Sequence, residues 1–101
     1  MARYRMEDGT IANTYMAADV WGEERDWAGD NVVSRNTGSQ WEHETLYLSS
    51  KGRYYIVSTS DWQGSMSTAH WVDKIQAVAW LLLNEHVIPA KLDRLAKTVS
   101  E

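Results

Sequence analysis

The sequence of 101 residues contains no cysteine. Without thiols the chain can form neither a disulfide framework nor a thiolate metal site. Long apolar runs are also missing, because the longest, Ala77–Leu83, is far too short to cross a bilayer. The charged segment Met1–Thr10 lacks the apolar stretch of a signal peptide. These absences favour a cytoplasmic protein that does not enter a membrane.

Several motifs of common enzymes are missing as well. The sequence has no phosphate-binding P-loop, no G-x-G-x-x-G, no G-x-S-x-G and no H-E-x-x-H. Lysine and arginine do not cluster, which disfavours direct binding of nucleic acid. We therefore predict a protein that is not an enzyme, with no catalytic residue, no cofactor and no metal site.

The aromatic residues are unusual in kind. There are six tryptophans and five tyrosines but no phenylalanine. Tryptophan and tyrosine each carry a polar group, so many of them should lie half-buried with one edge in water. Such residues suit the edge of a small core and equally suit a binding face.

Charge is distributed unevenly along the chain. Residues 1–50 hold four arginines against nine acidic residues, a net charge of -5, whereas residues 51–101 hold six basic against five acidic residues. An acidic half suits a partner with a basic surface. The length fits one domain, residues 1–101, acting as a monomer or a homodimer.

Short alternating segments predict strands. An Asp-Gly turn at residues 8–9 should join two short strands within residues 3–14. A second hairpin should span Trp41–Ser60, turning at Ser50–Gly52, and Met66–Val72 should form a further strand. Residues 15–27 are ambiguous between a short helix and an irregular strand.

The C-terminal third predicts two helices. Asp73 is a credible N-cap, and Gln76, three residues later, completes a capping box. An apolar stripe of Ile75, Val78, Ala79 and Leu82, widened by Ala77, Trp80 and Leu81, should face the sheet. Pro89 can lie in the first turn of a second helix. The expected fold is α+β, a mostly antiparallel sheet of four or five strands with two C-terminal helices packed on one face.

Histidine supports an alternative function. His43 and His70 are the candidates for a small metal-dependent enzyme, although neighbouring Glu42 and Glu44 should point away from His43 in a strand. His86 fits a helix C-terminus or the edge of the core. A further alternative is a dimeric antitoxin or transcription regulator that uses the bases of the last helix, Lys91, Arg94 and Lys97.

Tryptophan-bearing turns and nearby acids provide the leading hypothesis, which is binding to another protein. Tryptophan is among the side chains that most often anchor interfaces. The candidate partner-binding residues are Trp21, Glu23, Glu24, Asp26, Trp27, Asp30, Trp41 and Trp62.

Five segments carry a resemblance to short uncharacterised proteins of bacteria, phages and mobile elements. They are Asp8–Thr10, Thr37–Tyr47, Lys51–Tyr55, Trp62–Ser65 and Trp80–His86. The resemblance implies a self-contained accessory protein and supplies no catalytic residue. Small acidic proteins from such elements often resemble inhibitors, including anti-CRISPR proteins. A narrower hypothesis is therefore an inhibitor of a host complex that handles nucleic acid.

Overall fold

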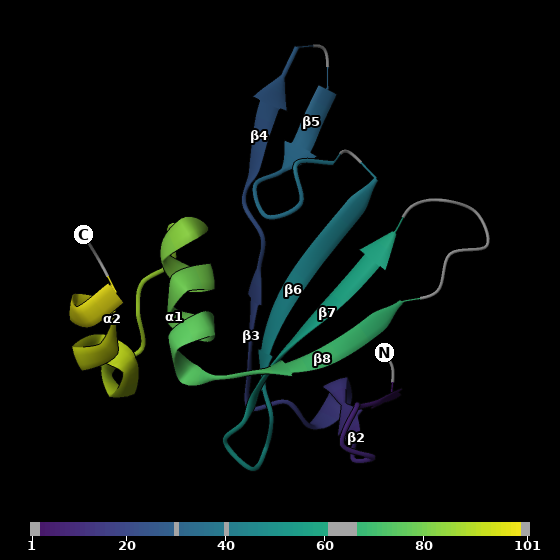
Figure 1. Cartoon of the computed structure of the whole chain (residues 1–101), viewed down its shortest axis with the longest axis vertical. Coiled ribbons are helices and arrows are strands. Elements are labelled where there is room, and N and C mark those ends of the chain that lie inside the picture. The colour runs from purple at the N-terminus through teal and green to yellow at the C-terminus, as the bar shows by residue number, and fades with distance from the viewer. Residues whose placement is uncertain (1–2, 30, 40, 61–66, 100–101) are drawn as a thin grey trace.

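A four-stranded antiparallel sheet forms the centre of the computed structural model, which describes residues 3–29, 31–39, 41–60 and 67–99. The order of its strands is β3-β6-β7-β8, and β1-β2 and β4-β5 form separate two-stranded sheets (Figure 1). The bounds are β1 Arg3–Arg5, β2 Ile11–Asn13, β3 Asp19–Gly22, β4 Arg25–Ala28, β5 Asn31–Ser34, β6 Glu42–Leu48, β7 Tyr54–Ser60 and β8 Thr68–Val72.

Four helical elements complete the described structure. A 3-10 turn, Thr14–Met16, precedes β3, and helix α1, Lys74–Leu83, follows β8. A second 3-10 turn, Ala90–Leu92, leads into α2, Asp93–Val99. Both C-terminal helices lie on one side of the sheet (Figure 1), which confirms the predicted α+β fold. None of the helices in the described residues is long and apolar enough to cross a membrane.

The central hairpin has the predicted geometry because its turn and its side-chain alternation agree. Leu46 opposes Ile56 and Leu48 opposes Tyr54 in the β6-β7 ladder. The turn contains Gly52 with φ of +89°, a left-handed conformation that glycine adopts without strain. These strands place apolar residues on both faces of the sheet, so each face needs a cover.

Each face of the sheet is covered by different elements. On one side, Leu46, Leu48, Tyr54 and Ile56 pack against residues of the helices, namely Ala77, Val78, Trp80, Leu81, Leu92 and Ala96. On the other side, Tyr55 and Val57 pack against Met6 and Ala12 of the β1-β2 hairpin. The short N-terminal hairpin is therefore part of the core and not an appendage.

Residues 15–27 form no α-helix, which decides between the two sequence interpretations. They contain part of the 3-10 turn and the strands β3 and β4. Val20 is 54 % exposed, whereas Trp21 is half-buried and packs against the helix-side core. The side chains alternate with the period of a strand because β3 pairs with β6, and this pairing outweighs a weak helical pattern.

Helix α1 begins as predicted and buries one side of the predicted stripe. Asp73 and Gln76 form the expected capping box. The buried residues are Ala77, Val78, Trp80 and Leu81, whereas the predicted Ile75 and Ala79 are exposed. Trp80 is the largest side chain of the helix, and it is buried with a 3.1 Å hydrogen bond from its indole Nε1 to Glu44. The buried face therefore includes all three residues that widen the predicted stripe.

Tyr55 yields a prediction about alkaline pH. Its hydroxyl is buried without a hydrogen-bond partner in the described part of the chain, and burial raises its pKa to about 12. An unfolded tyrosine releases its proton near pH ~10, so the free energy of unfolding should fall as pH rises from about 10 to 12. Tyr55→Phe should flatten that fall and leave stability at pH 7 nearly unchanged. Urea denaturation of both proteins at pH 7 and over the range from about pH 10 to 12 measures the free energy of unfolding. If that free energy falls as steeply in Tyr55→Phe as in the wild type, the prediction is wrong.

Candidate functional site

The hairpin formed by β4 and β5, residues 25–34, projects beyond the end of the main sheet (Figure 1). We call it the β4-β5 arm. Trp27 opposes Val32 in its ladder, so both side chains lie on one face of the arm. Trp27 is 76 % exposed and Val32 is 37 % exposed. The arm thus presents an apolar pair to solvent.

A buried carboxylate lies at the base of the arm. Glu23, between β3 and β4, has only 5 % of its side-chain surface exposed. Its Oε1 accepts hydrogen bonds of 2.7 Å from the Ser34 hydroxyl and from the backbone N–H of Glu44. Its Oε2 lies 2.7 Å from His43 Nδ1 and 3.3 Å from Arg25 Nε. One carboxylate therefore joins the β3-β4 bend, β5 and β6.

The environment of Glu23 favours its ionised form. Burial by itself would raise its pKa, but the hydrogen bonds from the Glu44 N–H, the Ser34 hydroxyl and His43 outweigh burial and lower the pKa below its ordinary value. Because an ionised carboxylate only accepts hydrogen bonds, His43 Nδ1 carries the hydrogen in this contact. The charge is compensated within the structure, where water has little access.

Asn84 links the arm to the end of α1. It is buried, and its side-chain Oδ1 accepts a 2.7 Å hydrogen bond from the backbone N–H of Glu24. Its Nδ2 donates to the carbonyl of Trp80 and to the side chain of Asn36. The single amide thus satisfies polar groups from three segments.

Arg35, directly after β5, makes the second link. Its guanidinium donates to Asp26 at 2.7 Å, to Glu85 at 3.0 Å and to the carbonyl of Leu83 at 3.1 Å. Hydrogen bonding with Arg35 lowers the pKa of Asp26, and hydrogen bonding with Asp26 and then with Glu85 raises the pKa of Arg35 above its ordinary value. The base of the arm is therefore held by charged and polar contacts from both sides.

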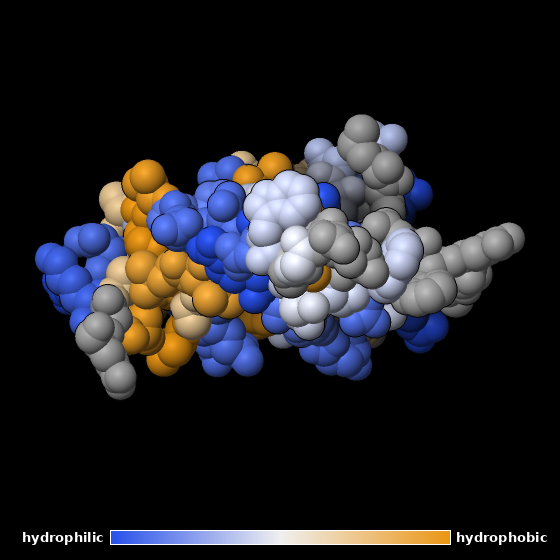
Figure 2. Space-filling view, turned by 90° about the horizontal axis from the view of Figure 1, so that it is seen from above, coloured by the Kyte–Doolittle hydropathy of each residue, from blue (hydrophilic) through white to orange (hydrophobic). Residues whose placement is uncertain are grey.

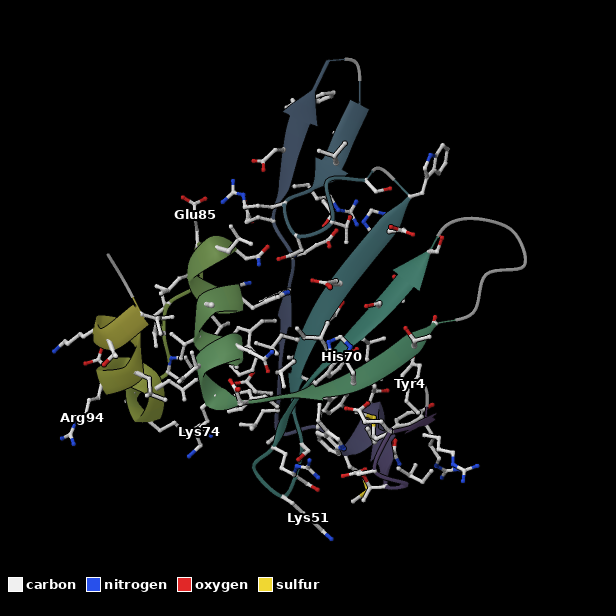
Figure 3. The ribbon with its side chains drawn as sticks, in the orientation of Figure 1. Tyr4, Lys51, His70, Lys74, Glu85 and Arg94 are labelled. Carbon is white, nitrogen blue, oxygen red and sulfur yellow. The ribbon has the colours of Figure 1, made fainter. Side chains whose placement is uncertain are left out.

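Exposed apolar surface is also present at the C-terminal end of α1, beside the arm. Figure 2 shows the molecule from the end at which the arm projects, and apolar surface is concentrated there on the side of the helices. Leu83 is 49 % exposed and Val87 is 90 % exposed. Glu85 points outward at this end of α1 (Figure 3). Helical spacing alone does not identify these residues, because it does not show that α1 ends beside the arm.

The structure separates the predicted partner-binding residues into three groups. Trp21 is half-buried against the core and the Glu23 side chain is buried, so both present less surface to a partner than the other candidates. Four residues are exposed, namely Glu24, Asp26, Trp27 and Trp41. Asp30 and Trp62 lie outside the described residues.

The alternative sites lack the geometry that they require. His43 opposes Thr59 and His70 opposes Ile56, which places the two histidines on opposite faces of the sheet. Across the described residues, no group of three or more acidic or histidine side chains is placed to hold a metal ion. His86 stacks on Trp80, with its Nε2 2.6 Å from the Gly22 carbonyl, so it packs at the core edge as predicted.

The basic residues of the last helix are not combined into one surface charge. Lys97 pairs with Asp93, and the amine of Lys91 lies 6.0 Å from the centre of the Tyr54 ring. Arg94 extends into solvent from α2 (Figure 3). This arrangement gives the regulator hypothesis no specific support.

No protein-family model matches the chain, and no curated protein sequence or solved structure matches it. The resemblance to short proteins of phages and mobile elements therefore stays a prediction.

Glu23 yields a prediction about stability in acid. Because its pKa is lower in the folded chain than in the unfolded chain, its contribution is present above pH ~4.3 and is lost as pH falls through the folded pKa. Glu23→Gln should cost about 1–3 kcal/mol at pH 7 by weakening hydrogen bonds to a charged group. The variant should also lose less stability than the wild type between neutral pH and acid.

The matched control is Glu24→Gln, since the neighbouring Glu24 side chain is exposed. This control should change stability by less than about 0.5 kcal/mol. Urea denaturation over a range of pH measures all three proteins. Equal effects of the two variants would mean that the buried contacts of Glu23 do not hold the base of the arm.

Proposed function

We propose that this chain is a small non-enzymatic protein that binds another protein through the β4-β5 arm, with Trp27 as the anchor. The observation that supports the proposal is the 76 % exposure of Trp27 on a projecting hairpin whose base is fixed by Glu23, Asn84 and Arg35. An exposed tryptophan has a large area to bury on a partner, and tryptophan is enriched among the residues that dominate binding energy.

The fixed base strengthens this argument. Binding costs conformational entropy when a loop must be ordered on contact, and a pre-organised segment avoids most of that cost. Ser34 and Arg35 connect the C-terminal strand of the arm to Glu23 and to α1. Trp27 is therefore carried on a segment that already has a defined direction.

Charge favours a partner with a basic surface. Glu24 is exposed, and Asp26 and Glu85 flank Arg35 at the base of the arm. Electrostatic complementarity of this kind accelerates association and selects among partners. A narrower form of the proposal, drawn from the resemblance, is that the partner belongs to a nucleic-acid-handling complex which this protein inhibits.

Substitution of Trp27 tests the proposal. Tagged wild type and Trp27→Ala are recovered from cells of the native host, and bound proteins are compared by quantitative mass spectrometry. We expect one protein that accompanies the wild type at fixed stoichiometry to be lost with Trp27→Ala. With that partner purified, calorimetry should show affinity reduced about 30-fold, which corresponds to ~2 kcal/mol.

The control is Tyr15→Ala, which removes a 68 % exposed aromatic ring from the opposite end of the sheet. It should retain the partner, and both variants should keep the wild-type melting temperature. If Trp27→Ala keeps full affinity for the partner, the arm is not the interface.

Arg35 provides a separate prediction about pre-organisation. Arg35→Gln removes the charged contacts to Asp26 and Glu85 while Trp27 stays in place. The arm should gain amplitude of motion on the ps–ns timescale, measured by ¹⁵N relaxation of residues 25–29 and 31–34. Affinity for the partner should fall by less than it does in Trp27→Ala. Unchanged relaxation would show that Arg35 does not restrain the arm.

A further inference from the structure

A pocket of about 200 Å³ lies at the end of the sheet opposite the β4-β5 arm. It forms where the β1-β2 hairpin meets the β6-β7 turn and β8 (Figure 1). Its apolar wall includes Ile11, Ala12, Met16 and Trp71, and its cationic residues are Lys51 and Arg53. Three segments far apart in sequence thus combine apolar and cationic groups in one hollow.

Two side chains of the apolar wall are largely exposed to solvent. Ile11 is 58 % exposed and Met16 is 63 % exposed. Trp71 forms a fixed part of the wall, because its Nε1 donates to Asp8 and to the Thr10 hydroxyl at 3.2 Å each. Apolar surface that is concave and held in place is typical of small-molecule sites.

The cationic groups are held by the same contacts. The guanidinium carbon of Arg53 lies 3.8 Å from the centre of the Trp71 ring, and its Nη1 donates to Asp8 at 3.1 Å. Hydrogen bonds from Thr10, and then from Arg53 and Trp71, lower the pKa of Asp8 despite some opposing burial, so Asp8 stays ionised. Arg53 is therefore kept against the indole.

Charge at the pocket is complementary to one anion. Asp8 balances Arg53, and Lys51 adds a further positive charge within a chain whose net charge is -4. Lys51 extends into solvent from the β6-β7 turn, beside the β1-β2 hairpin (Figure 3). Its ammonium group is flexible enough to meet a carboxylate at the mouth of the pocket.

We propose that this pocket binds a small carboxylic acid whose acid group is attached to a ring or a short branched apolar body. The body lies against Ile11 and Met16, and the carboxylate is held by Lys51, the cation of this pocket that Asp8 does not balance. The volume is below the range of about 300–1,000 Å³ that is usual for drug-sized ligands, which favours a ligand smaller than a nucleotide. The proposal does not depend on protein binding by the β4-β5 arm, because the two surfaces lie at opposite ends of the sheet.

NMR titration with a matched pair of ligands tests whether the pocket binds a carboxylic acid. 3-Phenylpropionate and its uncharged amide are titrated into ¹⁵N-labelled protein, and the indole N–H of Trp71, assigned with Trp71→Phe, is followed. We expect saturable shifts with the acid at Trp71 and at the amides of residues 11–13 and 49–53, and at least tenfold weaker binding of the amide. Absence of a saturable shift at these positions would overturn the proposal.

Two charge-reversal variants distinguish a contact between the ligand and Lys51 from an effect of the net charge of the protein. Lys51→Glu should weaken binding of the acid at least tenfold, whereas Arg94→Glu, the same charge change on α2, should leave it unchanged. Equal effects of the two variants would mean that no anion is held at this pocket. Tighter binding of N-acetyl-glycyl-phenylalanine than of 3-phenylpropionate would assign the pocket to the C-terminus of a polypeptide instead.

Discussion

The buried carboxylate of Glu23 is the constraint that joins the β4-β5 arm to the main sheet. A charge removed from water is costly unless hydrogen-bond donors replace the water. Here the donors come from Ser34, His43 and the backbone of Glu44, with Arg25 beside them. The carboxylate is satisfied only when β5, β6 and the β3-β4 bend are together, so its ionisation and the position of the arm are linked.

The two ends of the main sheet are stabilised by different kinds of interaction. Near the β1-β2 hairpin and beneath the helices, apolar side chains exclude water on both faces. At the arm, the contacts are hydrogen bonds and ion pairs made by Glu23, Asn84 and Arg35. Contacts of this second kind depend on pH and salt, and they are directional. They set the orientation of the arm more than they contribute to overall stability.

Local sequence signals predicted the elements that local interactions determine. The Asp-Gly turn, the central hairpin and the capping box of Asp73 and Gln76 each depend on residues within a few positions of one another, and all three are present. The strand in residues 19–22 was not distinguishable from a helix, because it is specified by pairing with β6. The hydrogen bond from Trp80 to Glu44 likewise joins residues 36 positions apart, which helical spacing does not reveal.

The candidate site was predictable only in part for the same reason. Trp27 was identified from its residue type and its place in the acidic segment, and its exposure suits an anchor. Glu23 and Glu24 are adjacent and chemically identical, yet one is buried and the other is exposed. The difference arises from Ser34, His43 and Glu44, which follow Glu23 by 11, 20 and 21 positions. No pattern within the acidic segment contains that information.

The position of the arm outside the core has a consequence for how this protein can evolve. Neither buried cluster of the described structure includes a residue of the arm. Substitutions near Trp27 and Val32 therefore escape the packing constraints that restrict change at Leu46 or Leu81. Under selection the arm can therefore diverge faster than the sheet and the helices, which supply most of the residues of the two buried clusters.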